Sequence, residues 1–270
     1  MFGSYYWKRP EILFAQRKDL GFKGKFPGFL RPFICLYVLL FGVPEIGFQI
    51  RVSSFIRAVK NLRFNRVLDA GCGLGLYSQY LEAVNQQAKI DAFDSDQNAV
   101  KICKSMYLKK EHPRLNFFKE NLVNFAKNKK YDLVISIDVL EHVFHWKKAL
   151  SSLTKSLCSG GYLLLHIPLL GQRRHLRYFS TWEHETHKDQ GINEGEIKSW
   201  LKDNDYFILK WEGDHRLFGS LAWELNMLAM KSLVLGALFY PLFYFLMKLD
   251  FVLPVKSKKY NCLLILAQKT

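Results

Sequence analysis

Gly71, Gly73 and Gly75 follow a short apolar segment at 67–70 and precede a segment with helical periodicity. Because glycine has no Cβ, a ligand can lie against the main chain of such a loop, where the first N–H groups of the helix are free. The spacing is GxGxG, which differs from the GxGxxG loop of dinucleotide-binding folds. Asp94 follows the next apolar segment, where its carboxylate can accept hydrogen bonds from both hydroxyls of a ribose. We therefore predict a ligand site where these two segments end.

The elements that must position this site alternate between two kinds of segment from residue 65 onward. Short apolar runs with the character of doubly buried strands cover residues 66–70, 89–93, 115–118, 133–137, 162–167, 206–211 and 260–267. Segments with helical spacing cover residues 76–84, 97–108 and 146–157, and a helix stop follows at 159–161. This alternation predicts an α/β fold with a doubly wound, mostly parallel sheet that helices cover on both faces.

Four stretches in this order resemble the class I S-adenosylmethionine-dependent methyltransferases, in particular the group that contains quinone-biosynthesis and lipid-modifying O-methyltransferases. They are VLDAGCGLG at 67–75, the strand ending in Asp94, YDLVISIDVLEHV at 131–143 and LCSGGYLLLHIP at 157–168. The resemblance covers residues 60–215. It implies a Rossmann-like methyltransferase fold with seven strands, of which only the last is antiparallel. It also implies S-adenosyl-L-methionine as cofactor, bound at the carboxyl edge of the sheet.

The resemblance further implies roles for single residues. The implied cofactor-binding residues are Asp69, Gly71, Gly73, Gly75, Asp94, Asn121, Leu122 and Asp138. The first four line the methionine end of the cofactor, Asp94 binds the ribose, and Asp138 lies beside the methionine moiety. Asn121 departs from the family, which usually has an Asp that contacts adenine at this position. Its amide oxygen can still accept a hydrogen bond from the adenine amino group, so we expect binding to survive.

Methyl transfer to a hydroxyl requires a base near the carboxyl edge of the sheet, and histidine has a suitable pKa. His142 follows the fourth predicted strand, His166 ends the fifth, and His184 and His187 lie in the segment TWEHETHKD. Each single histidine is more often packed or surface-exposed than catalytic. His187 and His142 are the preferred catalytic candidates.

Asp138, Glu141 and His142 form a D-x-x-E-H cluster, which a helical turn can bring together. The cluster is similar to the E-x-x-E-H cluster that holds a divalent ion in some relatives. Here a shorter Asp replaces the first Glu, and most family members with this sequence use the Glu and His to organise the loop. We therefore expect no bound metal, with these three residues as the alternative ligand set.

The chain has 270 residues, of which 49% are hydrophobic and 23% charged, so it can bury a core without disulfide support. Its net charge is +15, and residues 1–66 hold 12 basic against 3 acidic side chains. This excess implies an acidic partner: nucleic acid, anionic lipid headgroups or a phosphorylated substrate. Five cysteines without a CxxC pair indicate neither a disulfide framework nor a zinc site. Because the first residues do not read as a secretory signal, we expect a cytoplasmic protein.

Two uncharged apolar runs, at 33–43 and 232–247, depart from the α/β pattern. Both are shorter than the about 20 residues of a transmembrane helix, so we expect them to lie in a membrane interface or to form a re-entrant hairpin. The alternatives are a buried core helix and a dimer interface. The predicted organisation is an N-terminal helical cap at 1–64, a methyltransferase core at 65–215, an apolar helical insertion at 216–259 and the last strand at 260–270.

Basic flanks beside apolar faces describe a protein that is peripherally attached to the inner face of an anionic membrane. We therefore expect a lipid-like, polyprenyl or quinone-type acceptor, and no nucleic-acid partner. Two alternatives stay open: methylation of a soluble small molecule or of RNA, and a catalytically inactive, membrane-bound binding module with a methyltransferase fold. A homodimer through the surface at 232–247 also stays open.

Overall fold

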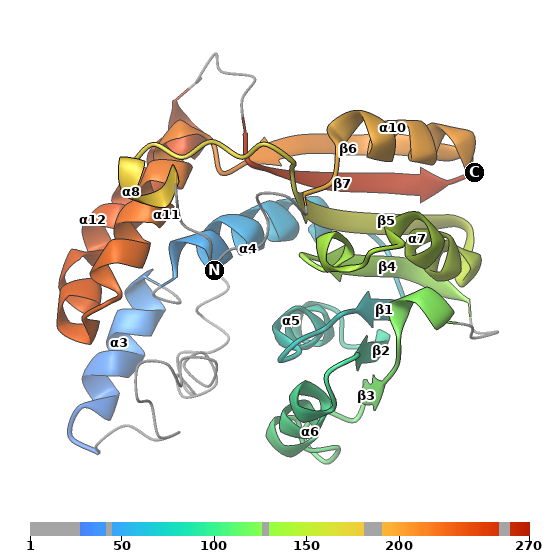
Figure 1. The fold of residues 1–270 in the computed structure, drawn as a ribbon. Coiled ribbons are helices and arrows are strands. Elements are labelled where there is room, and N and C mark those ends of the chain that lie inside the picture. Colours follow the sequence, from blue (N-terminus) through green and yellow to red (C-terminus); the bar gives the residue numbers. More distant parts are fainter. Residues whose placement is uncertain (1–27, 42–44, 126–129, 181–190, 254–259) are drawn as a thin grey trace. The chain divides into compact units, whose positions relative to one another are not determined.

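The computed structural model describes residues 28–41, 45–125, 130–180, 191–253 and 260–270. These residues fold as two compact units, both drawn in Figure 1. The helical unit takes the described residues within 1–57, 173–184 and 214–261, and the sheet unit takes those within 58–172, 185–213 and 262–270. The helical unit thus combines residues of the predicted cap and the predicted insertion.

The sheet unit is built on seven strands in the order β3-β2-β1-β4-β5-β7-β6 (Figure 1). They are β1 (Arg66–Ala70), β2 (Lys89–Asp94), β3 (Leu115–Lys119), β4 (Tyr131–Ile137), β5 (Leu157–Pro168), β6 (Tyr206–Asp214) and β7 (Cys262–Lys269). The pairs β1–β2, β1–β4, β2–β3 and β4–β5 are parallel, and β7 is antiparallel to β5. This confirms the predicted seven-stranded, mostly parallel α/β fold.

The strand order reverses between β1 and β4, which are neighbours although two strands separate them in the sequence. Loops that leave such neighbouring strands diverge at their carboxyl ends, and open α/β sheets bind ligands in the resulting crevice. The glycine loop leaves β1 and Asp138 leaves β4, so the sequence motifs meet at this reversal.

Helices of the sheet unit occupy the intervals between strands: α5 (Leu76–Val84), α6 (Gln97–Met106), α7 (Trp146–Lys155) and α10 (Glu194–Asp203), with short 3-10 turns η2 (Leu122–Asn124) and η3 (Leu140–His142). The segment 159–161, predicted as a helix stop, lies within β5. Tyr131 pairs with Leu157 and Leu133 with Tyr162, so the intervening residues of β5 bulge out of register. The fifth strand therefore starts earlier than its apolar run.

The helical unit contains α3 (Arg31–Phe41), α4 (Ile46–Val59), α8 (Arg177–Ser180), α11 (Leu217–Ala229) and α12 (Leu233–Val252), although the last two residues of α4 belong to the sheet unit. Its core is formed by the side chains of Ile46, Ile50, Ala222, Trp223, Tyr240, Phe243 and Met247. The segment 232–247 forms one helix with its continuation to Val252, so the re-entrant hairpin considered for it is wrong. Among the described residues, Val234–Val252 is long and apolar enough to cross a membrane, a test that a core helix can also pass.

Helix α12 continues through Pro241, which has no N–H to donate to the carbonyl of Ala237 four residues earlier. Tyr37 of α3 supplies the missing hydrogen bond: its hydroxyl donates to the Ala237 carbonyl oxygen over 3.0 Å. Burial raises the pKa of Tyr37 further above its usual range, so the hydroxyl keeps its proton. A second hydroxyl, that of Tyr240, donates to the carbonyl oxygen of Phe41 over 3.4 Å and also joins the two helices.

Replacing Tyr37 with Phe is expected to lower the free energy of unfolding by about 1–2 kcal/mol, because the Ala237 carbonyl loses its partner. In a Pro241→Ala background the new N–H can bond to this carbonyl, so the same Tyr37→Phe change should cost markedly less. Chemical denaturation of the four proteins of this double-mutant cycle measures the coupling. Equal costs in both backgrounds would contradict the compensation.

Two buried carboxylates organise the helical unit around α11. Asp250 of α12 accepts the N–H groups of Phe218 and Gly219 over 2.9 and 2.7 Å, and so caps the positive N-terminus of α11. Glu224, which is fully buried in α11, accepts the N–H groups of His175 and Leu176 over 2.9 and 2.7 Å. Burial raises the pKa of Asp250, whereas these backbone hydrogen bonds lower it. The side of α12 that faces α11 is therefore attached to a polar framework.

Candidate functional site

The three glycines of the loop after β1 all have positive φ angles, but the space at their Cβ positions differs. A Cβ at Gly71 (φ 80°) would overlap the side chain of Val139, and one at Gly75 (φ 71°) would lie 2.7 Å from the ring of Phe117. At Gly73 (φ 52°) no atom lies within 4 Å of the Cβ position. A ligand can therefore approach the main chain at Gly73, as predicted. At Gly71 the side chain of Val139 already occupies the space beside the main chain.

Asp94 ends β2, and one of its carboxylate oxygens reaches the glycine loop. One oxygen accepts the N–H of Gly73 and the other accepts the N–H of Asp96, each over 2.9 Å. A carboxylate has about four acceptor positions, so two remain for the hydroxyls of a ribose. The open face of Gly73 and this carboxylate therefore adjoin each other, and they fit the S-adenosylmethionine expected from the sequence.

Helix α6 holds the same loop from its other side through residues that the sequence patterns do not single out. The Cys103 thiol donates to the Gly73 carbonyl oxygen over 3.2 Å, and the Tyr107 hydroxyl donates to the Leu74 carbonyl oxygen over 3.1 Å. A hydrogen bond to Cys103, together with burial, raises the pKa of the Cys72 thiol far above its usual range. These thiols are therefore structural, and no local spacing in the sequence indicates that they meet.

Asp69 lies near the end of β1 and is 2% exposed. Its carboxylate accepts a hydrogen bond from the Ser78 hydroxyl over 2.6 Å. Burial raises the pKa of Asp69 from 3.8 to about 7, with a further increase from the charge of Asp94 and an opposing effect of the Ser78 hydrogen bond. Half of these carboxyl groups are then protonated near neutral pH, so Asp69 is poised to respond to a positive charge nearby.

S-adenosylmethionine carries positive charge at its methionine end, which favours ionised Asp69. Its affinity is therefore expected to rise by about tenfold between pH 6 and pH 8, with release of a proton on binding. Calorimetry in buffers of different ionisation enthalpy measures both quantities. In Asp69→Asn only the pH dependence of the ligand and of other groups should remain, and a variant with the full wild-type dependence would contradict the assignment.

The raised pKa of Asp69 also determines how the stability of the ligand-free protein changes with pH. The pKa of Asp69 is higher in the folded than in the unfolded protein. Its contribution to the free energy of unfolding is therefore fully present below pH 3.8 and is lost as the pH rises to about 7. Asp69 thus opposes folding at neutral pH unless a cationic ligand compensates.

Asn121 and Leu122 lie at the start of η2, beyond the carboxyl end of β3. The side-chain oxygen of Asn121 accepts the N–H of Val123 over 2.9 Å and so caps this turn, and Leu122 is buried. The oxygen has a second lone pair, so the predicted contact with adenine remains compatible with the cap.

Asp138 directly follows β4 and has a positive φ of 52°. Its N–H donates to the His166 carbonyl oxygen over 2.9 Å, and its carboxylate pairs with the Nδ1 atom of the His166 ring. His166 at the end of β5 is 1% exposed. The structure thus holds Asp138 twice, by backbone and side chain, next to Val139, which contacts the glycine loop.

Of the two preferred base candidates, the structure describes His142 and not His187. His142 lies in η3 with a half-exposed side chain, and its Nε2 atom is 3.9 Å from Oε1 of the buried Glu141. Asp138, the third member of the alternative metal cluster, is instead paired with His166. His187 and His184 lie outside the described residues. The catalytic assignments to His187 and His142 stay predictions.

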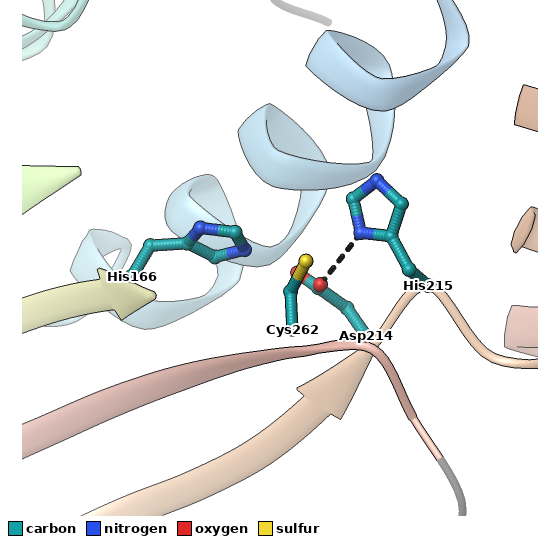
Figure 2. A group of neighbouring side chains, drawn as sticks. All are labelled: His166, Asp214, His215 and Cys262. Carbon is teal, nitrogen blue, oxygen red and sulfur yellow. Dashed lines mark hydrogen bonds and ion pairs between the residues drawn. The ribbon is translucent and has the colours of Figure 1, made fainter. Parts of the chain in front are cut away.

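Each unit also contains side chains of a type that can bind a metal ion. Figure 2 shows His166 and Cys262 of the sheet unit together with Asp214 and His215 of the helical unit. Within the helical unit, His215 Nδ1 lies 2.9 Å from Asp214 Oδ1.

Comparison with known proteins extends these observations. Residues 50–210 match a family described as methyltransferase domain. A ubiquinone biosynthesis O-methyltransferase of Rickettsia akari is 30% identical over 99 residues, which are 37% of this chain and 38% of the relative. Its mitochondrial counterpart in Candida albicans is 27% identical over 152 residues, 51% and 45% of the two chains. The alignments thus span less than half the length of these curated relatives.

Among solved structures, an O-methyltransferase from a trans-AT polyketide synthase multienzyme of Brevibacillus brevis, in complex with S-adenosyl-L-homocysteine, superimposes with a TM-score of 0.56. The match covers 82% of this chain and 72% of that one at 15% identity, so it shows a similar fold and nothing further.

Proposed function

Because this chain belongs to the class I S-adenosylmethionine-dependent methyltransferases, we propose that it methylates a hydroxyl oxygen of a lipid-like acceptor, of polyprenyl or quinone type, that it takes from a membrane surface. The observation that carries the proposal is the exposure of large apolar side chains on α3 and α12 of the helical unit. Contiguous exposed apolar surface indicates an interaction with an apolar partner. The names of the two curated relatives, both ubiquinone biosynthesis O-methyltransferases, support an acceptor of this class.

The residues of the sheet unit that support cofactor binding lie around the glycine loop. When bound, S-adenosylmethionine supplies an electrophilic methyl group to the acceptor oxygen. Asp94 would hold the ribose, and Gly73 would leave room for the ligand against the main chain. Cys103 and Tyr107 keep the loop in place through its carbonyl groups. These contacts would fix the position of the cofactor before the acceptor arrives, and such positioning can supply a large share of the rate gain in a two-reactant step.

The proton of the acceptor hydroxyl must leave as the oxygen attacks, so a base has to lie beside it. His142 and His187 are the candidates, and a base contributes about 100-fold to 10,000-fold in rate. Alanine variants of a true base lose turnover without losing cofactor affinity. The two variants are therefore compared in the assay described next.

The experiment measures transfer of a radioactive methyl group to two catechols with the same ring, one with a long polyprenyl tail in phospholipid vesicles and one without a tail in solution. We expect kcat/KM for the tailed acceptor to be higher by at least about tenfold, because burial of each methylene contributes binding energy. An RNA pool and a soluble amine serve as competing acceptors. Equal rates for both catechols, or transfer to RNA alone, would overturn the proposed acceptor class.

A further inference from the structure

Helices α3 and α12 each present an apolar face that the core of the helical unit does not use. Apart from Val252 at the end of α12, the side chains on these faces that are more than half exposed are Phe33, Leu36, Leu40, Val234, Leu238, Leu242 and Phe245. They recur at helical spacing on the side opposite to the buried positions Tyr240, Phe243 and Met247 of α12. We call these seven side chains the outer surface.

The two helices are neighbours in the helical unit (Figure 1), and the outer surface has members on both of them. The rings of Tyr37 and Tyr240 are 6.1 Å apart, and those of Phe41 and Tyr244 are also 6.1 Å apart. The Tyr37 hydroxyl bonds to the Ala237 carbonyl that Pro241 leaves without its helical partner. In an apolar solvent an unpaired backbone carbonyl is costly, so this bond makes the helix pair compatible with acyl chains.

The charged residues of the helical unit indicate which kind of partner the outer surface contacts. The described residues of the helical unit include nine arginines and lysines and four acidic residues. Three of these acids, Asp214, Glu224 and Asp250, are buried, and the fourth, Glu45, lies 3.5 Å from an arginine. The exposed charge is therefore positive. A second copy would bring like charges together, whereas anionic lipid headgroups complement them.

Cations and aromatic rings pair near both ends of α12. Lys231 precedes the helix, and its Nζ atom lies 2.7 Å from the Tyr178 hydroxyl. Near the other end, Lys248 lies 4.9 Å from the centre of the Tyr244 ring, and Arg57 lies 4.5 Å from that of Phe251. Lysine and arginine keep their charged ends in water above an apolar surface, and aromatic residues are favoured at the headgroup level. Both ends of α12 thus carry features of a membrane–water interface.

A spanning orientation of α12 conflicts with its inner side. Its 20 residues would reach about 30 Å, which is enough to cross a bilayer. However, its Asp250 caps α11, and Glu224 in α11 binds the backbone at residues 175 and 176. Spanning would carry this carboxylate framework into hydrocarbon, which is costly. An orientation parallel to the membrane leaves it on the aqueous side.

From these observations we infer that α3 and α12 insert sideways into one leaflet of an anionic bilayer, with the outer surface among the acyl chains and α11 toward water. This inference deepens the proposed function and rests on it for its purpose, because the insertion places the protein where a lipid-like acceptor is dissolved. It differs from a membrane span in that both ends of α12 lie at the same depth.

The test measures the depth of nitroxide labels on single added cysteines in the full-length protein, bound to vesicles of phosphatidylcholine and phosphatidylglycerol. Val234→Cys, Leu242→Cys and Val252→Cys sample the start, middle and end of α12. The protein without added cysteine gives the background from the native thiols. Sideways insertion predicts similar depths, about 5–10 Å below the phosphates, at all three positions. A profile that is deepest at Leu242 would show spanning, and water-like accessibility at all three would exclude insertion.

A charge-neutral variant provides the second readout. Leu238→Ser/Leu242→Ser/Phe245→Ser should lower partitioning into these vesicles by at least about tenfold, because three large side chains lose their apolar transfer energy. Phe207→Ser is the matched control, since Phe207 is 64% exposed on β6 of the sheet unit. S-adenosylmethionine affinity should be unchanged in both. A triple variant that still sediments with vesicles like wild type would overturn the inference.

Failure of the inference and failure of the proposed function give different results. If the acceptor class is wrong but insertion is right, the depth profile stays flat and no polyprenyl catechol is methylated. If insertion is wrong but the acceptor class is right, the triple variant and wild type methylate the tailed catechol in vesicles at the same rate.

Discussion

Replacing Asp94 with Ala is expected to weaken the binding of S-adenosylmethionine by about tenfold to a hundredfold. The carboxylate accepts the N–H groups of Gly73 and Asp96 and has two acceptor positions left for the ribose. The net loss of one hydrogen bond to a charged group costs about 1.5–3 kcal/mol, which corresponds to about tenfold to a hundredfold in affinity. Loss of the carboxylate therefore removes direct contacts with the ligand and also releases the loop that carries Gly73.

Titration calorimetry of the variant against wild type gives the affinity ratio. Asp94→Asn keeps one acceptor oxygen, so its loss should be intermediate. The matched control is Asp91→Asn on the same strand, because Asp91 bonds to Asn116 and Tyr131, which lie outside the loop. An unchanged affinity in Asp94→Ala would remove the ribose assignment, and an equal loss in Asp91→Asn would indicate a general effect on β2.

Replacing Gly71 with Ala is expected to reduce the affinity for S-adenosylmethionine by about a hundredfold. The residue has a φ of 80°, and the new methyl group would lie 2.7 Å from Cγ1 of Val139. A left-handed backbone costs a residue with a Cβ about 1–2 kcal/mol, and overpacking adds about 1–3 kcal/mol. The loop must shift to relieve both costs, and Gly73 and Asp94 would then lose their alignment.

Calorimetry and thermal unfolding together separate the two costs. Gly71→Ala/Val139→Ala removes the steric overlap but keeps the backbone strain, so it should recover part of the affinity. Gly160→Ala is the control, because Gly160 has a similar φ of 74° and open space at its Cβ position, within β5. It should lower stability by about 1 kcal/mol and leave the affinity unchanged. Wild-type affinity in Gly71→Ala would show that the loop tolerates the shift.

The sheet and its glycine loop could be predicted from the sequence because their signals are local. A doubly buried strand needs a short apolar run, and a turn with positive φ favours glycine, so neighbouring residues in the sequence determine both. The segments around Val67, Ile90 and Leu133 illustrate this, since each becomes a buried parallel strand. Asp94 follows one of these strands, and its place facing the loop follows from the parallel order.

Contacts between distant segments were decided only by the tertiary structure. Val139 fills the space beside Gly71, and Cys103 binds the Gly73 carbonyl, although neither residue has a signal of its own in the sequence. Helix α12 continues through Pro241, and Tyr37, about 200 residues away, bonds to the carbonyl that the proline leaves without its helical partner. Which side of α12 is covered likewise depends on α11 and α3. Composition predicts that a segment is apolar, but only packing decides which of its side chains remain exposed to a partner.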